Sequence, residues 1–483
     1  MPQSKTWAIS IIGLGYVGLS TAACLASRGF NVTGVDIDKE KVAALKKGVS
    51  TIHEEGLDSL LRRSLVQGTL HLRSNYDGLE RSKIVFITVG TPSRQDGRVD
   101  LEYVEAAAKQ IGRQLELARG YRLVVVKSTV KPGTTDGLVR HNLEKESRKE
   151  VGPDFGLASN PEFLHEGSAI RETLHPEAVV IGGHDKRSVN TLLKMYDAFY
   201  GRRPPTIITT PSNAEMMKYA INAGRATQVS FVNTIANYCT RVPGCDYDEV
   251  RKGLSVVARM DERYLGAGVG FGGSCLPKDC RALASELKSS GVRDEVVTPA
   301  LRVNDGQVGE AIRLAERLCG SLDGKRVSIL GLAFKAGTDD IRESVPLALV
   351  KALVRKGAEL TVFDPAAMEN TRGLLGKQVA YAKSPKDALR GSECAFIATG
   401  WEAFKKLRPS DFKGLMATPV VVDGRRIYDQ RKFTQGGVRI ATIGTGPQHD
   451  VERGGARSTP KLREWHYVVT DGEVRSGHFM YSG

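Results

Sequence analysis

The first 210 residues alternate between short apolar runs and longer segments in which apolar positions recur every three or four residues. The short runs are typical of buried strands, and the longer spacing is typical of amphipathic helices. The strands predicted in this way are 7–12, 31–35, 84–89, 123–127, 155–159, 178–181 and 206–209. Strands that alternate with helices predict a mostly parallel, doubly wound α/β sheet. Ligands of such a sheet bind where the strands end.

The turn after the first strand has the spacing of a dinucleotide-binding fingerprint. Gly13, Gly15 and Gly18 lie between that strand and an apolar helix, and Asp36 follows the second strand. Glycines let a pyrophosphate approach the helix N-terminus, where free N–H groups favour an anion. Because Asp36 would accept hydrogen bonds from a ribose and repel a 2′-phosphate, we expect NAD rather than NADP. A plain βαβ turn without a nucleotide is the alternative.

A different pattern follows the last of these strands. Residues 213–241 contain no proline and one glycine, and their apolar positions have helical spacing, so we predict a helix capped by Ser212 or Asn213. At 1.5 Å per residue it would be about 43 Å long, enough to bridge two domains. Lys218 and Asn222 are four residues apart and share one face of it. A solvated lysine on a spacer helix is the alternative reading.

A second α/β unit begins near Asp323, with predicted strands 326–330, 359–363, 394–398, 420–423 and 438–443. Its first turn, 331–335, lacks the full glycine fingerprint, so we expect it to bind a different nucleotide. We therefore predict two Rossmann-like doubly wound domains joined by a long central helix. The expected bounds are 1–210, 211–315 and 316–445, followed by a tail, 446–483, of unknown role whose residues 466–469 alternate weakly.

A glycine-flanked cysteine is the main candidate for covalent chemistry. Cys275 follows Gly272 and Gly273 and precedes Lys278 and Asp279. A thiol becomes a strong nucleophile when a nearby cation or an oriented backbone lowers its pKa. Lys278 and Asp279 supply a charge and a candidate acid or base. A glycine-rich turn with a packed thiol remains the alternative on these residues alone.

Composition and charge narrow the function classes for the 483 residues. The net charge is +14, but Lys and Arg form no dominant run, so we do not expect nucleic-acid binding. No apolar run is long enough for a membrane span, and the N-terminus has no signal-peptide pattern. The seven cysteines are scattered and match neither a disulfide framework nor a zinc site. We therefore expect a cytoplasmic protein with no metal ion and no membrane or nucleic-acid partner.

Several motifs in this order resemble the UDP-glucose/GDP-mannose dehydrogenase family. The resemblance covers residues 7 to 445, and six ordered motifs are highly specific. Besides the Cys275 loop, the segments that carry it are 13–19, 128–134, 160–167, 218–222, 330–343 and 423–426. The resemblance implies an NAD-dependent enzyme that oxidises the C6 alcohol of a nucleotide sugar to a carboxylate. It also implies a homodimer or a higher homo-oligomer.

The resemblance also implies contacts for each ligand. The residues expected at NAD are Gly13, Gly15, Tyr16, Val17, Gly18, Asp36, Lys41, Thr91, Pro92, Ser128, Thr129, Glu166, Lys278 and Arg342. The residues expected at the sugar nucleotide are Glu162, Phe163, Leu164, Glu166, Lys218, Asn222, Arg263, Tyr264, Gly268, Phe271, Gly272, Phe334, Lys335 and Arg425. Arg263 is preferred over Arg259 as the arginine that reaches a neighbouring subunit.

The implied catalytic residues are Cys275, Lys218, Asn222, Asp279, Glu162 and Thr129. Water held by Asp279 and Thr129 would take the hydroxyl proton in the first oxidation. Cys275 would then attack the bound aldehyde, and a second oxidation would convert the thiohemiacetal to a thioester. Glu162 would be the base for hydrolysis, with Lys218 and Asn222 stabilising the oxyanions.

The substrate inferred from the motifs is UDP-glucose, because 423–429 resembles that branch of the family. GDP-mannose or another UDP-hexose is the in-class alternative, since 335–340 looks like the GDP-mannose branch. An NAD-binding sensor without activity, and a two-electron hydroxyacid dehydrogenase, are alternatives from other classes. The sensor needs none of the chemical groups, and the hydroxyacid enzyme needs neither Cys275 nor the second α/β unit.

Overall fold

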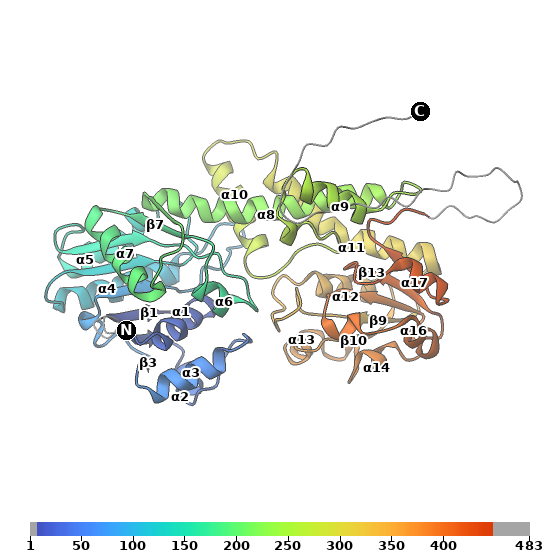
Figure 1. Ribbon diagram of the computed structural model, residues 1–483, viewed down its shortest axis with the longest axis horizontal. Coiled ribbons are helices and arrows are strands. Elements are labelled where there is room, and N and C mark those ends of the chain that lie inside the picture. The colour runs from blue at the N-terminus through green and yellow to red at the C-terminus, as the bar shows by residue number, and fades with distance from the viewer. Residues whose placement is uncertain (1–6, 448–483) are drawn as a thin grey trace, which may run out of the picture. The chain divides into compact units, whose positions relative to one another are not determined.

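The computed structural model describes residues 7–447 (Figure 1). The first sheet has the strand order β3-β2-β1-β4-β5-β6-β7-β8, and its pairs are parallel except for β6 with β7. Its strands are β1 (Ala8–Ile12), β2 (Asn31–Val35), β3 (Leu70–Arg73), β4 (Ile84–Ile87), β5 (Arg122–Val126), β6 (Phe155–Ser159), β7 (Val179–Gly183) and β8 (Thr206–Thr209). Its helices are α1 (Tyr16–Ser27), α2 (Lys39–Lys46), α3 (Leu57–Val66), α4 (Glu102–Leu117), α5 (Arg140–Ser147), α6 (Ala169–Leu174) and α7 (Lys186–Tyr200).

Side chains on the two faces of this sheet belong to two separate cores. Ile9 and Ile11 of β1 pack in one core with α1, α3 and α7. Val85 and Ile87 of β4 pack in the other core with α4 and α5. Alternate residues of a strand point to opposite faces, and helices cover both faces here, so the predicted doubly wound α/β fold is confirmed.

The long central helix is α8 (Pro211–Cys239), drawn in green in Figure 1. It begins two residues earlier than predicted. Thr210, not Ser212 or Asn213, is its N-cap, and the Thr210 hydroxyl accepts the Asn213 N–H at 3.4 Å. The predicted cap was wrong because Pro211 occupies the first helical position, where its fixed φ is favourable and its missing N–H costs nothing.

Further helices pack along α8 and carry the predicted cysteine loop. They are α9 (Tyr247–Val256), α10 (Leu276–Ser289) and α11 (Val297–Cys319). Tyr219 and Ala223 of α8 share a core with Cys280 and Leu283 of α10. The C-terminal part of α8 contributes Val232, Ala236 and Cys239 to a different core, which belongs to the second sheet. The helix therefore joins both halves of the chain through buried side chains.

The second sheet is entirely parallel and has the order β11-β10-β9-β12-β13-β14. Its strands are β9 (Arg326–Leu330), β10 (Glu359–Phe363), β11 (Ala380–Tyr381), β12 (Cys394–Ile397), β13 (Val420–Asp423) and β14 (Arg439–Thr442). Its helices are α12 (Val345–Arg355), α13 (Met368–Leu375), α14 (Pro385–Leu389), α15 (Glu402–Lys405), α16 (Pro409–Leu415) and α17 (Gln430–Gln435). Two cores again lie on its two faces, one with α11 and α12 and the other with α14, α16 and α17.

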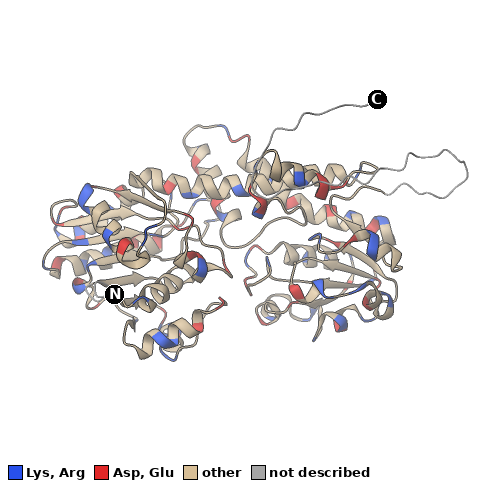
Figure 2. Ribbon diagram, in the orientation of Figure 1, with Lys and Arg blue, Asp and Glu red and all other residues tan. Residues whose placement is uncertain are grey.

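Charged positions of both signs are interspersed over both sheets and their helices (Figure 2). Among the described residues, no helix is long and apolar enough to cross a membrane. The weak alternation predicted at 466–469, with most of the tail from 446, lies outside the described residues.

Candidate functional site

The first glycine turn has the geometry that a dinucleotide needs. Gly13 has a φ of +94°, which favours glycine. A Cβ on Gly18 would lie 1.8 Å from the Gly13 carbonyl oxygen, so α1 can approach the turn only with glycine there. A Cβ on Gly15 would meet nothing within 4 Å and would project into open space. Gly13 and Gly18 therefore serve the fold of the turn, and Gly15 keeps its outer surface clear for a ligand.

Asp36 lies at the end of β2 beside this turn. Its carboxylate accepts the Leu14 N–H at 2.9 Å and the Asp38 N–H at 3.0 Å, and it pairs with Lys41 Nζ at 3.0 Å. The predicted cofactor residue Lys41 thus contacts Asp36 directly. Of the other predicted cofactor residues, Thr91 is buried, and Ser128 donates to the Val89 carbonyl at 2.7 Å. Both follow strand ends of the first sheet.

Cys275 lies at the start of α10 and faces a pocket of about 350 Å³. Gly273, with a φ of +88°, bends the chain ahead of it, and the Gly273 N–H donates to the Arg342 carbonyl of the second α/β unit at 3.1 Å. A Cβ on Gly273 would lie 2.7 Å from the Phe334 ring. The glycines of the loop therefore allow the cysteine to lie against the second unit.

Two pairs of polar side chains meet behind Cys275, one helical turn apart on α8. Lys218 Nζ donates to Glu162 Oε1 at 3.2 Å, and Asn222 Nδ2 donates to Asp279 Oδ2 at 2.6 Å. All four side chains are buried, and Asp279 is 0% exposed. Lys278 Nζ also donates to Asp279, at 2.5 Å. The predicted shared face of Lys218 and Asn222 thus connects the loop after β6 with the cysteine helix.

The electrostatics of the cysteine differ from the expectation. Burial in the surrounding protein raises the pKa of the Cys275 thiol above its ordinary value, against the lowering effect of the Lys218 ammonium. The charges of Asp279 and Glu162 raise it further. The sequence predicts a lowered pKa from the neighbouring lysine. That expectation was wrong because burial of the thiol, with the charges of Asp279 and Glu162 added to it, outweighs the Lys218 ammonium.

Glu162 and Lys218 hold each other in their charged forms. Burial favours a raised pKa for Glu162, but the Lys218 charge and the Leu164 N–H outweigh it, and the pKa is lowered. Burial likewise opposes the charge on Lys218, but Glu162 and the other nearby anions raise its pKa. Glu162 is therefore an ionised carboxylate at neutral pH, which a general base must be.

The pocket in front of Cys275 brings together most of the predicted substrate residues. These are Leu164, Glu166, Lys218, Asn222, Arg263, Tyr264, Phe271, Gly272, Phe334, Lys335 and Arg425. Gly268 is not on its wall: a Cβ there would lie 2.2 Å from the Gly424 carbonyl oxygen, so this glycine serves backbone packing. Glu162 and Phe163 line a second cavity instead.

Arg425 supplies a free positive group at this pocket. Its Nε donates to the Ala398 carbonyl at 2.7 Å and its Nη1 to the Gly270 carbonyl at 3.0 Å. Its buried Nη2 has no hydrogen-bond partner among the described residues. Burial lowers the pKa of Arg425 to about 10, so the side chain is still charged at neutral pH. An unpaired guanidinium nitrogen on a pocket wall fits a phosphate group.

Glu166 joins three parts of the chain. Its Oε1 accepts the Ser274 hydroxyl at 2.9 Å and lies 3.3 Å from Arg342 Nη2. Arg342 also pairs with Asp340. Burial, together with the negative charge of Asp340, raises the pKa of Glu166 to about 7. The two predicted cofactor residues Glu166 and Arg342 are therefore in contact, beside the cysteine loop.

Arg263 makes its contacts within its own chain. Its guanidinium pairs with Asp261 at 2.7 Å and with Glu177 at 2.7 Å. Its neighbour Tyr264 accepts or donates a hydrogen bond with His165 Nε2 at 2.6 Å. The expected reach of Arg263 to a neighbouring subunit remains a prediction.

Some residues at the site were not found from the sequence. Tyr16 of the glycine turn donates to the buried carboxylate of Glu54, and the same carboxylate accepts the Gly167 N–H at 2.8 Å. Lys127, at the end of β5, donates to Asn160 Oδ1 at 3.1 Å. Glu54 lies in a loop that carries no motif. Lys127 is the last residue of a predicted strand, and this position was a signal that could have found it.

Comparison with known proteins adds independent information. The sequence matches three domains described for the UDP-glucose/GDP-mannose dehydrogenase family: the NAD binding domain over residues 7–200, the central domain over 212–306 and the UDP binding domain over 328–430. It is 41% identical to a UDP-glucose 6-dehydrogenase of Haloferax volcanii, over 88% of this chain and 98% of that protein. A UDP-glucose 6-dehydrogenase of Bacillus subtilis is 37% identical over 90% and 97%.

Solved structures show the same likeness. A UDP-glucose dehydrogenase from the hyperthermophilic archaeon Pyrobaculum islandicum is 37% identical, with a TM-score of 0.84 over 92% of this chain and 99% of that one. A UDP-D-ManNAc dehydrogenase from Pyrococcus horikoshii is 28% identical, with a TM-score of 0.79 over 90% and 99%.

Proposed function

Because this chain belongs to the UDP-glucose/GDP-mannose dehydrogenase family, we propose that it oxidises the C6 hydroxyl of UDP-glucose to the carboxylate of UDP-glucuronate. The family predicted from the motifs, the NAD cofactor and the activity of an NAD-dependent nucleotide-sugar dehydrogenase are confirmed. The observation that carries the substrate and mechanism is the pocket itself. Cys275, Lys218 and Arg425 all line it, and the buried Nη2 of Arg425 has no hydrogen-bond partner among the described residues.

The first α/β unit is the part that fits NAD. The clear space beside Gly15 and the carboxylate of Asp36 suit a pyrophosphate and a ribose, respectively. Bound NAD supplies the hydride acceptor for both oxidations. Glu166 and Arg342 lie between this unit and the cysteine loop, where they would contact the cofactor and the sugar in turn.

Arg425, Lys335 and Phe271 would bind the nucleotide part of the substrate. Burial lowers the pKa of Lys335, although nearby carboxylates oppose this. The negative charge of a diphosphate would offset the burial of Lys335 and Arg425, which supports an anionic ligand here. UDP-glucose is favoured over GDP-mannose because the relatives from Haloferax and Bacillus are UDP-glucose 6-dehydrogenases.

In the first oxidation the chain must accept the proton of the C6 hydroxyl. The Lys218 ammonium would stabilise the developing alkoxide, and a water at Thr129 would relay the proton. Asp279 is fully buried and accepts from both Asn222 and Lys278. Its part is therefore to orient Asn222 and to balance the charge of Lys218.

In the second oxidation Cys275 attacks the aldehyde carbon and gives a thiohemiacetal. Its raised pKa means that the free thiol is mostly protonated, so its proton must leave as the C–S bond forms. Lys218 and Asn222 stabilise the oxyanion. Loss of the second hydride yields a thioester on Cys275.

Hydrolysis releases the product. The ionised carboxylate of Glu162 accepts a proton from water, which attacks the thioester carbon while the C–S bond breaks. Overall, one alcohol, one water and two NAD+ would give one carboxylate, two NADH and three protons. The covalent route keeps the aldehyde bound between the two oxidations.

The experiment that tests this function is NADH stoichiometry. With limiting UDP-glucose we expect two NADH and one UDP-glucuronate per sugar, and a much lower kcat/KM with GDP-mannose. Cys275→Ser should stop after at most the first oxidation, because a serine hydroxyl is a much weaker nucleophile toward the bound aldehyde than a cysteine thiol. Uronate formation by this variant at the wild-type rate would contradict the covalent route, and one NADH per sugar would indicate a two-electron enzyme.

We also propose that the protein assembles as a homodimer through α8. One exposed side of this helix carries Met216, Phe231 and Tyr238, which are 38–68% exposed. A row of large apolar side chains on a surface helix favours association. Phe231→Glu should give a monomer by light scattering, and a dimer that persists in this variant would contradict the proposed surface.

A further inference from the structure

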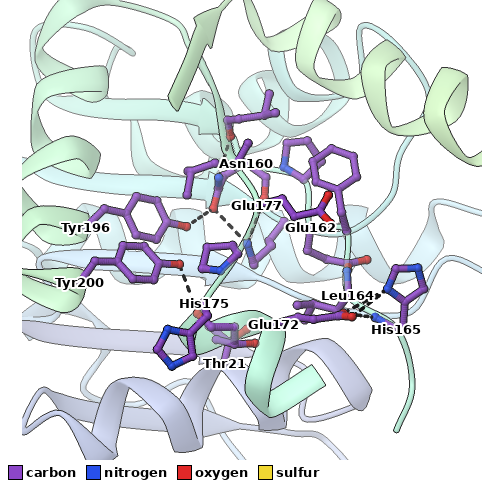
Figure 3. Close-up of a pocket in the computed structure, with 18 of the residues that line it drawn as sticks. Thr21, Asn160, Glu162, Leu164, His165, Glu172, His175, Glu177, Tyr196 and Tyr200 are labelled. Atoms are coloured by element: carbon purple, nitrogen blue, oxygen red, sulfur yellow. Dashed lines mark hydrogen bonds and ion pairs between the residues drawn. The ribbon is translucent and has the colours of Figure 1, made fainter. Parts of the chain in front are cut away.

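A second cavity, of about 420 Å³, lies on the other side of the Glu162 loop from Cys275. Its walls come from the segment 160–180, α7, β8 and α8. Tyr196 and Tyr200 of α7 project from one side, and Leu164 and His165 lie on the other (Figure 3). None of the steps proposed above uses this cavity.

One ion pair separates this cavity from the cysteine pocket. Glu162 lines the second cavity but not the cysteine pocket, whereas Lys218 lines the cysteine pocket but not the second cavity. Their side chains are joined by the 3.2 Å hydrogen bond. The two partners are 9% and 4% exposed. Leu164, His165, Arg225 and Arg263 line both spaces, so the two spaces adjoin around this ion pair. Water can therefore reach the Glu162 carboxylate from the second cavity, whereas the substrate would occupy the cysteine pocket.

A second cation, Lys127, lines the second cavity together with Glu162. Its Nζ donates to the Asn160 carbonyl at 3.4 Å and to Asn160 Oδ1 at 3.1 Å. The amide of Asn160 is fixed by Tyr196, whose hydroxyl donates to Oδ1 at 2.5 Å, and by the Val180 carbonyl at 2.7 Å (Figure 3). An ammonium has three N–H donors, so one is left for the cavity among the described contacts.

Lys127 is charged at neutral pH, although burial lowers its pKa to about 8. The Glu162 carboxylate opposes this lowering and the Lys218 ammonium adds to it, which places Lys127 within electrostatic reach of both. Lys127 and Glu162 also line the same cavity, so the remaining N–H of Lys127 and the carboxylate of Glu162 can hold one water between a donor and an acceptor. Such a site has the polar partners that a buried water requires.

We propose that the second cavity supplies the water that hydrolyses the Cys275 thioester, and that Lys127 positions this water against Glu162. The inference rests on the proposed function. During the second oxidation the sugar nucleotide and NAD occupy the cysteine pocket, which closes the front approach to the thioester carbon. A water behind Glu162 needs no ligand to leave.

The step balances within this site. The water oxygen bonds to the thioester carbon, one of its protons passes to Glu162, and the C–S bond breaks. Cys275 departs as a thiolate beside Lys218, and the sugar leaves as a carboxylic acid that ionises. Glu162 returns its proton to solvent through the cavity. Lys127 keeps its proton throughout and is a positioning residue.

Two variants test the route. Lys127→Met removes the donor, and Ala178→Phe fills the cavity from its wall. In stopped-flow experiments with saturating UDP-glucose and NAD, we expect both to form the first two NADH per active site at the wild-type rate. Steady-state turnover should then fall at least tenfold, and acid-quenched protein should carry the mass of the thioester on Cys275. Lys127→Arg should restore part of the turnover.

Lys131→Met is the matched control, because this lysine is 44% exposed and pairs with Glu286 away from the cavity. It should behave as wild type. The inference is overturned if Lys127→Met and Ala178→Phe slow the first two NADH as much as turnover, or if they turn over normally. If wild-type enzyme itself forms fewer than two NADH per sugar, the proposed function fails instead, so the two failures are distinguishable.

Discussion

The turns after the first strands of the two sheets, β1 and β9, share their backbone geometry but have different roles. Each has a glycine with positive φ after its first strand, Gly13 at +94° and Gly331 at +108°. Each also has an aspartate at the end of its second strand, Asp36 after β2 and Asp364 after β10. The chain thus builds the same half-fold twice.

The two aspartates differ in how many hydrogen bonds their carboxylates already accept from the protein. Asp364 is 1% exposed and accepts from the N–H groups of Leu332, Ala333, Ala366 and Ala367 and from the Trp401 indole. Asp36 is 9% exposed and accepts from two N–H groups and Lys41. Asp364 is used to hold the second turn together through hydrogen bonds to its backbone. Asp36 accepts fewer hydrogen bonds, so its carboxylate can still accept one from a ligand. An acid at this position is therefore evidence for a nucleotide only where its oxygens are not already satisfied.

The largest expected effect is on folding, from Asp364→Ala. The change leaves several buried N–H groups without an acceptor, each of which costs about 1–3 kcal/mol. We expect the free energy of unfolding to fall by about 3–5 kcal/mol, measured by chemical denaturation, with NAD affinity unchanged in the folded fraction. Asp36→Ala is the matched variant: it should weaken NAD affinity and lower the free energy of unfolding by less than Asp364→Ala does. Equal stability losses in the two would contradict the contrast.

The next effect is on binding, from Gly15→Ala. Because its Cβ meets no protein atom, the fold should tolerate it, but the methyl group enters the space assigned to the pyrophosphate. We expect the Kd for NAD to rise at least tenfold, about 1.4 kcal/mol, by calorimetry, with Tm within a degree or two. Gly331→Ala is the control, since its Cβ would lie 2.5 Å from Thr399. It should lower Tm and spare the NAD Kd.

The smallest effect is a pH dependence where the two α/β units meet. The pKa of Glu166 is about 7 in the folded protein, above its ordinary value, so the folded state binds more protons between pH 4.5 and 7. Its contribution to stability is full at low pH and is lost as pH rises through 7. Glu166→Gln should flatten this part of the profile by about 1 kcal/mol in denaturation between pH 5 and 8.

Glu172→Gln gives the opposite sign as a control. Hydrogen bonds from His165 outweigh burial and lower the pKa of Glu172. That carboxyl therefore contributes stability above its ordinary pKa, and the contribution is lost as pH falls. A profile that Glu166→Gln leaves unchanged would show that Glu166 is not the group responsible.

Much of the fold was predictable because most of its strands are apolar runs that contribute to the buried cores. β2, β6, β8, β9, β10 and β13 have the predicted bounds, and most others differ by one or two residues at an end. β3 was missed because Leu70–Arg73 is short and alternates with polar residues. β11 has two residues and too little pattern to detect. Edge strands carry less of the core, so their sequences are less constrained.

The site was predictable where backbone geometry demands a residue type, and less so where side chains meet from distant segments. Gly18 is required by its contact with Gly13. Lys218 and Asn222, four residues apart, do face the same side of α8 and contact Glu162 and Asp279. The pKa of Cys275 is raised mainly by burial in the folded protein and also by Glu162, which lies more than one hundred residues away along the chain, so the predicted direction of the shift was wrong. Gly268 was assigned to the substrate because sequence cannot distinguish a glycine facing a ligand from one facing backbone.

Helix α8 has a consequence for how this protein can change over generations. It carries Lys218 and Asn222 at one end and core residues of the second sheet, Val232 and Ala236, at the other. One inserted residue between them would turn every later side chain by about 100° and shift it by about 1.5 Å. Substitutions at exposed positions outside the site and the proposed dimer surface should cost much less stability. At those positions the helix should tolerate changes of residue while its length stays fixed, because an insertion or deletion would misalign the site with the core of the second sheet.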